Sequence, residues 1–211
     1  MGAKSSTKSP PDAKKVSKVW VLVVAGYSTA AVALVAFLTI NGASGIPTAA
    51  TIGTAALIAI GLLLPAAGML QLGRGLGPTK RAAKYGFSMQ AFGFIVLFFG
   101  VVLIVAVVTL TAYLISAALV TTAGVSAIAG AVLLHKHFTK TNDSNLGGAA
   151  YLILGTVLIF SGVGAIVGSN IAFEFLISQL QNTVYVDIGA AVSACGFVLA
   201  AYSFYVLHNH S

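Results

Sequence analysis

The stretch that decides the fold is Phe87–Leu134, FSMQAFGFIVLFFGVVLIVAVVTLTAYLISAALVTTAGVSAIAGAVLL, which contains no charged side chain. It is about 48 residues long, whereas one helix crosses a bilayer with about 20 apolar residues. We therefore divide it into two membrane helices, at 87–108 and 113–135. The turn between them falls near Thr109, where neither glycine nor proline marks its position.

The composition of the whole chain agrees with a membrane location. Hydrophobic residues make up 58% of the 211 residues and charged residues only 7%, against about 25% charged in ordinary soluble domains. A soluble fold with so few charges would expose large apolar patches to water, which monomers rarely tolerate. A bilayer removes this difficulty, because apolar side chains can face lipid.

Four further apolar stretches flank the central one, and each is long enough to cross a bilayer. We place these helices at 19–40, 51–72, 147–168 and 188–207. Pro65 is expected to kink the second of them, because its ring blocks a backbone hydrogen bond. The sequence thus predicts an all-α bundle of six transmembrane helices spanning 19–208. A basic tail at 1–18 precedes this bundle, and its composition predicts that it is disordered.

Two segments leave alternatives open. Residues 169–186 are amphipathic, so they either extend the fifth helix beyond the bilayer or lie in the membrane interface. The start of the chain, Met1–Ser6, fits the short pattern for myristoylation of Gly2. A protein with six spans does not need that lipid as an anchor.

The positive charges predict the orientation. If the N-terminus is cytoplasmic, the cytoplasmic segments 1–18, 73–86 and 135–146 hold all 11 Lys and Arg residues, and the opposite side holds none. This is the distribution of the positive-inside rule, and it places both termini in the cytoplasm. The basic residues near the membrane are expected to contact anionic lipid or an acidic partner. They are Lys14, Lys15, Lys18, Arg74, Lys80, Arg81 and Lys84.

Glycines recur in register when the chain is shifted by 62 residues. The shift brings Gly86, Gly93 and Gly100 onto Gly148, Gly155 and Gly162. We interpret this as a two-helix internal repeat, although glycine-rich apolar sequences also align by chance. Glycine allows helix backbones to approach closely, so the third and fifth helices are expected to form the tight centre of the bundle. The predicted packing residues are Gly93, Gly100, Gly155, Gly162, Gly164 and Gly168.

The sequence lacks the residues that catalysis or ion coupling would need. No charged residue lies in mid-span, where proton-coupled and active transporters usually carry one. Motifs for serine hydrolases, zinc proteases and phosphate-binding loops are absent. The four histidines stand at helix ends, and Cys195 is single. We therefore expect a protein that is not an enzyme and that holds no metal or cofactor.

Polar side chains within the spans have two interpretations. Ser and Thr usually bond to their own helix or join neighbouring helices. The alternative is a polar pathway, for which Gln90, Thr121 and Thr122 are the candidates. Gln90 is the most costly of them to bury.

These observations favour a non-catalytic multi-pass membrane protein that acts as a scaffold or as an accessory subunit of a membrane assembly. Its expected partners are membrane lipid and either other membrane proteins or copies of itself, and not nucleic acid. The alternative is a channel or facilitator for a small solute. A third and weaker alternative is an enzyme acting on lipid, which would use Glu174, Asp187 or the histidines.

Overall fold

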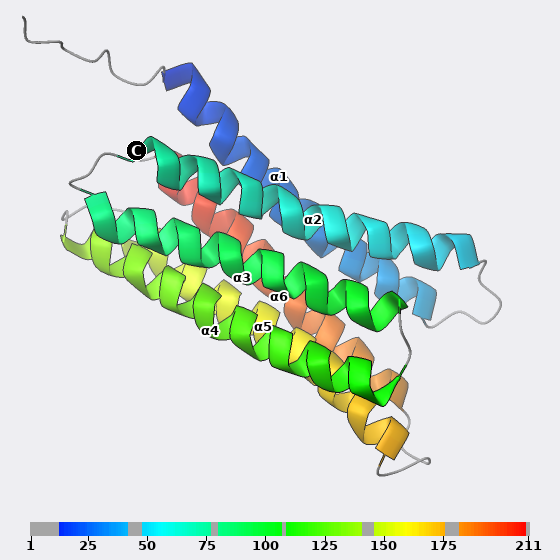
Figure 1. The fold of residues 1–211 in the computed structure, drawn as a ribbon. Helices are drawn as coiled ribbons and strands as arrows, with labels where there is room; N and C mark the ends of the chain where they lie inside the picture. Colours follow the sequence, from blue (N-terminus) through cyan, green and yellow to red (C-terminus); the bar gives the residue numbers. More distant parts are fainter. Residues whose placement is uncertain are drawn as a thin grey trace, which may run out of the picture.

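The computed structural model contains six α-helices (Figure 1). It describes residues 13–41, 48–76, 80–106, 109–140, 146–175 and 182–209. The helices are α1 (Ala13–Asn41), α2 (Thr48–Gly75), α3 (Arg81–Ala106), α4 (Leu110–Lys140), α5 (Leu146–Phe175) and α6 (Asn182–Asn209). Within these residues no β-strand occurs, so the prediction of an all-α bundle with six helices is confirmed. Gly2 and most of the predicted tail lie outside the described residues.

The helices extend beyond the predicted apolar stretches at most of their ends. Helix α1 begins at Ala13 rather than at residue 19, and α3 begins at Arg81 rather than at residue 87. Lys and Arg are good helix formers, so the helix continues after the hydrophobic stretch has ended. The polar loop predicted at 73–86 therefore shrinks to the few residues between α2 and α3.

The helices form a closed ring, in which each helix packs against the helices before and after it and α6 returns to α1 (Figure 1). Neighbouring helices run antiparallel, and the closest packing occurs within the hairpins α1·α2, α3·α4 and α5·α6. Among the described residues, α3 and α5 make no backbone approach to each other. The prediction that these two helices form the tight centre is therefore wrong. The duplication inferred from the shifted glycines remains a prediction.

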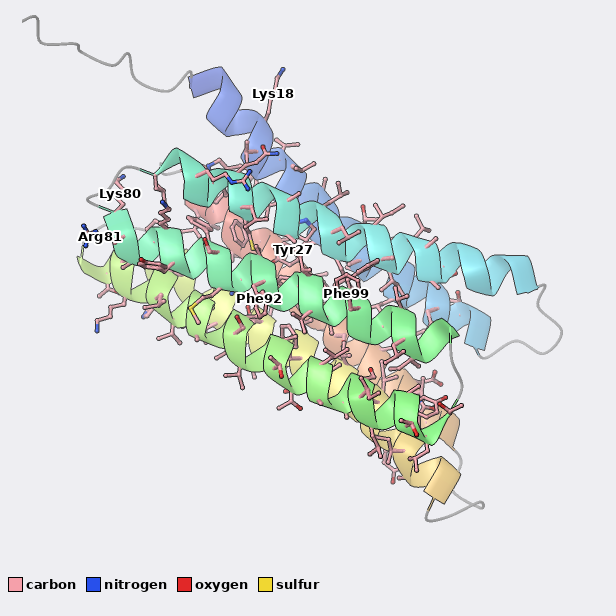
Figure 2. The ribbon with its side chains drawn as sticks, in the orientation of Figure 1. Lys18, Tyr27, Lys80, Arg81, Phe92 and Phe99 are labelled. Carbon is pink, nitrogen blue, oxygen red and sulfur yellow. The ribbon has the colours of Figure 1, made fainter. Side chains whose placement is uncertain are left out.

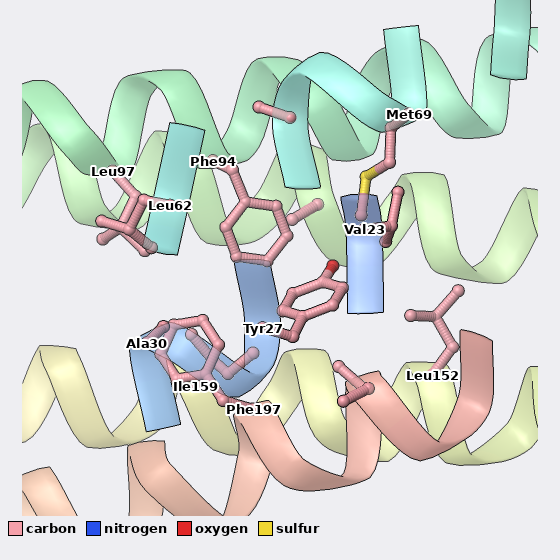
Figure 3. Close-up of a cluster of buried hydrophobic side chains, with 14 of the residues drawn as sticks. Val23, Tyr27, Ala30, Leu62, Met69, Phe94, Leu97, Leu152, Ile159 and Phe197 are labelled. Atoms are coloured by element: carbon pink, nitrogen blue, oxygen red, sulfur yellow. The ribbon is translucent and has the colours of Figure 1, made fainter. Parts of the chain in front are cut away.

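Aromatic side chains fill the centre of the ring in two layers. In the first, Trp20 contacts Phe204 and Phe87, with ring centroids 5.6 Å and 6.3 Å away. In the second, which Figure 3 shows, Tyr27 contacts Phe94 and Phe197 at 5.4 Å and 6.0 Å.

The spacing of these residues explains the two layers. Corresponding members on α1, α3 and α6 are seven residues apart in the sequence, which is two helical turns or about 10 Å along each axis. The side chains of the second layer are at most 2% exposed. We call these the Trp20 layer and the Tyr27 layer.

The outer surface of the ring is apolar. Phe92 and Phe99 on α3 are 53% and 57% exposed, and both project away from the bundle (Figure 2). Each of the six helices is long and apolar enough to cross a membrane, by length and composition. The chain is an integral, multi-pass membrane protein, and lipid would cover this surface.

Helix α2 continues through Pro65, where the sequence predicts a kink. The proline ring is buried against Gly26 of α1, and a Cβ atom added at Gly26 would overlap Pro65 Cδ. The glycine thus makes room for the proline, so Pro65 is part of the contact between α1 and α2.

Candidate functional site

The contact between α5 and α6 is made by glycine backbones. A Cβ added at Gly155 would lie 2.8 Å from Gly196 O, and one added at Gly196 would lie 2.7 Å from Gly155 O. Gly162 and Gly189 approach each other's carbonyl oxygens in the same reciprocal way. Such contacts place Cα–H groups against carbonyl oxygens, a weak attraction that recurs where helices pack closely. Both glycines predicted on this side of α5, Gly155 and Gly162, lie in this interface.

The contact between α3 and α4 has a tight and a loose part. A Cβ added at Gly93 would lie 2.7 Å from Ala123 O and from Ala127 Cβ. At Gly100 the nearest atoms would be 3.5 Å away, on Ser116 and Leu119 among others, which is ordinary van der Waals contact. Gly93 is therefore required by the close approach of α4, whereas Gly100 leaves room for a methyl group.

Gly164 and Gly168 are not packing residues in the described part of the chain, contrary to the prediction. A Cβ added at either one would meet no atom within 4 Å. Gly164 follows Gly162 by two residues, which is about 200° around a helix. These two glycines consequently face outward, although their four-residue spacing resembles that of helix-packing motifs.

A further glycine contact, between α1 and α2, was not predicted. Gly61 approaches the backbone of Ala30, and Gly68 approaches the side chain of Val23. Gly61 and Gly68 are seven residues apart, like the packing glycines of α3 and α5. That seven-residue spacing was the signal by which the sequence could have indicated this contact.

Gln90 connects three helices in the interior of the bundle. Its side chain is fully buried, and its Nε2 donates to Ala127 O of α4 at 2.9 Å and to Thr156 Oγ1 of α5 at 3.3 Å. Thr156 Oγ1 in turn donates to Leu152 O at 2.7 Å. The sequence singled out Gln90 as the candidate most costly to bury, and the structure places it as a link between α3, α4 and α5.

Serine side chains add hydrogen bonds across the same interfaces. Ser116 Oγ donates to Gly100 O at 2.9 Å, and Ser193 Oγ donates to Ile159 O at 3.1 Å. Ser203 Oγ donates to Gly148 O. These bonds join α3 to α4 and α5 to α6, so they strengthen contacts that glycine already makes close.

Thr121 and Thr122 do not share a polar pathway with Gln90. Both are exposed on the outer surface of α4, and each hydroxyl donates to a carbonyl of its own helix, at 2.8 Å to Ala117 O and 2.9 Å to Ala118 O. This is the bond by which Thr satisfies its hydroxyl in lipid. The prediction that these three residues line one path is wrong.

Basic side chains gather at one end of the ring, which we call the basic end. It contains the start of α1, the end of α2, the start of α3 and the end of α4 (Figure 2, where Lys18, Lys80 and Arg81 are labelled). The exposed basic side chains described there are Lys18, Arg74, Lys80, Arg81, Lys84 and Lys136. The side chains of Lys14 and Lys15 lie outside the described set, although both residues belong to α1.

Four of the five exposed tyrosines that the structure describes stand on the same half of the bundle, and the fifth, Tyr185, stands near the start of α6 at the other end. Tyr85, Tyr151, Tyr202 and Tyr205 are each 43% to 62% exposed, and the rings of Tyr151 and Tyr202 are 5.6 Å apart. Tyrosine is enriched where hydrocarbon meets headgroups. Tyrosines below a ring of Lys and Arg therefore match the interface of a bilayer.

The remaining titratable residues of the described chain lie apart from one another. No group of three His, Cys, Asp or Glu residues there could hold a metal ion. His135 Nδ1 is buried without a hydrogen-bond partner among the described residues, and Cys195 is exposed on α6. The arrangement as a whole is suited to holding helices together and to lying in lipid.

Neither known protein families nor curated proteins nor solved structures gave a match to this chain.

Proposed function

We propose that this chain is a non-catalytic membrane scaffold or an accessory subunit of a larger membrane assembly. The observation that supports this is the filled interior of the ring. Tyr27, Phe94, Phe197 and Phe204 are at most 2% exposed at its centre, and glycine brings the surrounding helices into backbone contact. A rigid body of this kind presents six outer helix faces and one basic end to its surroundings.

The same observation weighs against the alternative of a channel. A solute path along the ring axis would have to pass the Trp20 layer and the Tyr27 layer, whose rings are packed against one another. Two of the three residues considered for a path face outward instead. Proteoliposomes containing the folded protein should therefore show no added permeability across a broad panel of small solutes.

The basic end is proposed to lie in the cytoplasm, where it contacts anionic lipid or an acidic partner. Each Lys or Arg near an anionic surface contributes about 1 kcal/mol. Replacing Arg74, Lys80, Arg81 and Lys84 by Gln should reduce the anionic lipid that co-purifies with the protein. The matched variant K80R/K84R keeps the charge and should retain that lipid. Equal retention by both variants would refute the contact.

The scaffold proposal is tested by purification from the native membrane in mild detergent, followed by mass spectrometry of the intact complex. We expect other membrane proteins in a fixed ratio to this chain. The chain alone, as a monomer or a closed homo-oligomer, would contradict the proposal and would make flux measurements decisive.

A further inference from the structure

Two polar atoms in the centre of the bundle have no hydrogen-bond partner among the residues that the structure describes. They are the hydroxyl oxygen of Tyr27 and Oε1 of Gln90, and both are buried. In a bilayer the surrounding lipid cannot supply a partner, so buried polar groups need one inside the protein. The two atoms are chemically complementary, because the tyrosine hydroxyl is a donor without an acceptor and the amide oxygen is an acceptor without a donor.

The orientation of the Gln90 amide follows from its neighbours. Thr156 has a single hydroxyl hydrogen, which it donates to Leu152 O, so its oxygen can only accept from Gln90. Ala127 O is also an acceptor. The NH₂ group of Gln90 therefore faces both of them, and exchanging its nitrogen and oxygen would leave two acceptors facing an oxygen.

The positions of Tyr27 and Gln90 along their helices place both side chains near the level between the two aromatic layers. Gln90 stands on α3 three residues after Phe87 and four before Phe94, that is, between the Trp20 layer and the Tyr27 layer. Tyr27 belongs to the second layer, but its ring also contacts Phe204 of the first layer, with centroids 5.7 Å apart. Helical side chains lean toward the N-terminus of their helix, which for α1 is the direction of the Trp20 layer.

The close-up view agrees with this direction. Figure 3 shows the hydroxyl oxygen of Tyr27 on the side of Val23 and Met69, away from Ala30 and Leu97. Val23 lies one turn before Tyr27 on α1, toward the basic end.

We propose that a water molecule between the two aromatic layers bridges the Tyr27 hydroxyl and Gln90 Oε1. The water accepts a hydrogen bond from the Tyr27 hydroxyl and donates one to Gln90 Oε1. Water is the smallest molecule that both donates and accepts, and ordered water of this kind satisfies buried polar groups in many proteins. This inference does not depend on the proposed function.

The direction in which one substitution changes the melting temperature shows whether a water molecule bridges Tyr27 and Gln90. Tyr27→Phe removes only the hydroxyl. If the hydroxyl has no partner, its removal should raise the melting temperature of the protein in detergent. If water bridges it to Gln90, the removal should lower the melting temperature. The exposed control Tyr205→Phe should leave it unchanged in either case.

A double-mutant cycle then tests the connection to Gln90. We expect Tyr27→Phe to lower the melting temperature in the wild type, and by less than half as much in a Gln90→Met background. An unchanged or raised melting temperature for Tyr27→Phe would overturn the proposal, as would an equal effect in both backgrounds.

A density map of the wild-type protein in nanodiscs, at a resolution that shows ordered water, gives a second readout. It decides the question even if the Gln90 variant does not fold. Density between the Tyr27 hydroxyl and Gln90 Oε1, lost in Tyr27→Phe, is the expected result. A direct bond between the two side chains, or a centre without such density, would refute the bridge.

Discussion

The two faces of α5 carry glycines with opposite structural roles. On the face toward α6, Gly155 and Gly162 lie against the backbone of the neighbouring helix. On the outer face, Gly164 and Gly168 have open space where a side chain would stand. The difference shows that a glycine is needed where it faces a neighbouring helix. Its spacing from another glycine does not decide this.

The largest loss of stability is expected for a substitution on the face of α5 toward α6. Gly162→Leu would place a side chain where Ser193 and the carbonyl of Gly189 already lie, and backbone cannot move aside at low cost. Overpacking of this kind costs typically about 1–3 kcal/mol and occasionally more, so we expect a loss of at least about 3 kcal/mol or a failure to fold. Denaturant unfolding in mixed micelles would measure it.

The matched control is Gly168→Leu, which changes the same residue type on the same helix. It should unfold at the same denaturant concentration as the wild type or at a slightly higher one, because leucine is a better helix former than glycine. Similar losses for both variants would show that α5 has no distinct packing face.

The contact between α3 and α4 offers a smaller version of the same comparison. Gly93→Ala should cost about 1–3 kcal/mol, because its methyl group would meet Ala123 O at 2.7 Å. Gly100→Ala has 3.5 Å to its nearest neighbours, so it should be neutral or mildly stabilising. Unfolding of the two variants side by side provides the measurement, and a reversed order would contradict the assigned approach of the two helices.

Replacing an outward glycine by alanine should stabilise the protein. Glycine within a helix is less stable than alanine by about 0.5–1 kcal/mol, because it loses more backbone freedom on folding. Gly168→Ala should gain that amount, which a shift of the unfolding midpoint would show. A loss would mean that another molecule packs against this face of α5 in the sample.

Removing a hydroxyl from α5 should also cost more stability on its buried face than on its exposed face. Thr156→Val keeps the volume of the side chain but removes the acceptor for Gln90 Nε2, so it should cost about 0.6 kcal/mol and at most about 1.7. Ser161→Ala, on the exposed face, should change the stability little. Equal costs at both positions would indicate that Thr156 does not support Gln90.

The number and positions of the six helices could be predicted because apolar stretches alternate with polar segments. All basic residues fell outside the proposed spans, which located the ends to within several residues. The helices proved longer because a helix can continue through residues such as Arg81 and Lys84 after leaving the hydrocarbon. Hydropathy indicates where a helix leaves the hydrocarbon, but the helix itself does not have to end there.

The inner and outer faces of each helix could not be predicted, because lipid is as apolar as the interior. Phe92 and Phe94 are two residues apart on α3, yet one is 53% exposed and the other fully buried. In a soluble protein a polar residue would have marked the outer position. The same lack of contrast misplaced Gly164, Gly168, Thr121 and Thr122. Gln90 was recognisable because a buried amide is costly anywhere.

The return of α6 to α1 has a consequence for the order of the chain. Every helix has two neighbours, so no helix occupies an edge, and the described chain starts and finishes at the same end of the ring. The arrangement would be unchanged if the two ends were joined by a linker and the chain were opened between α2 and α3. Such a circular permutant would keep every interhelical contact, because the ring has no topological beginning.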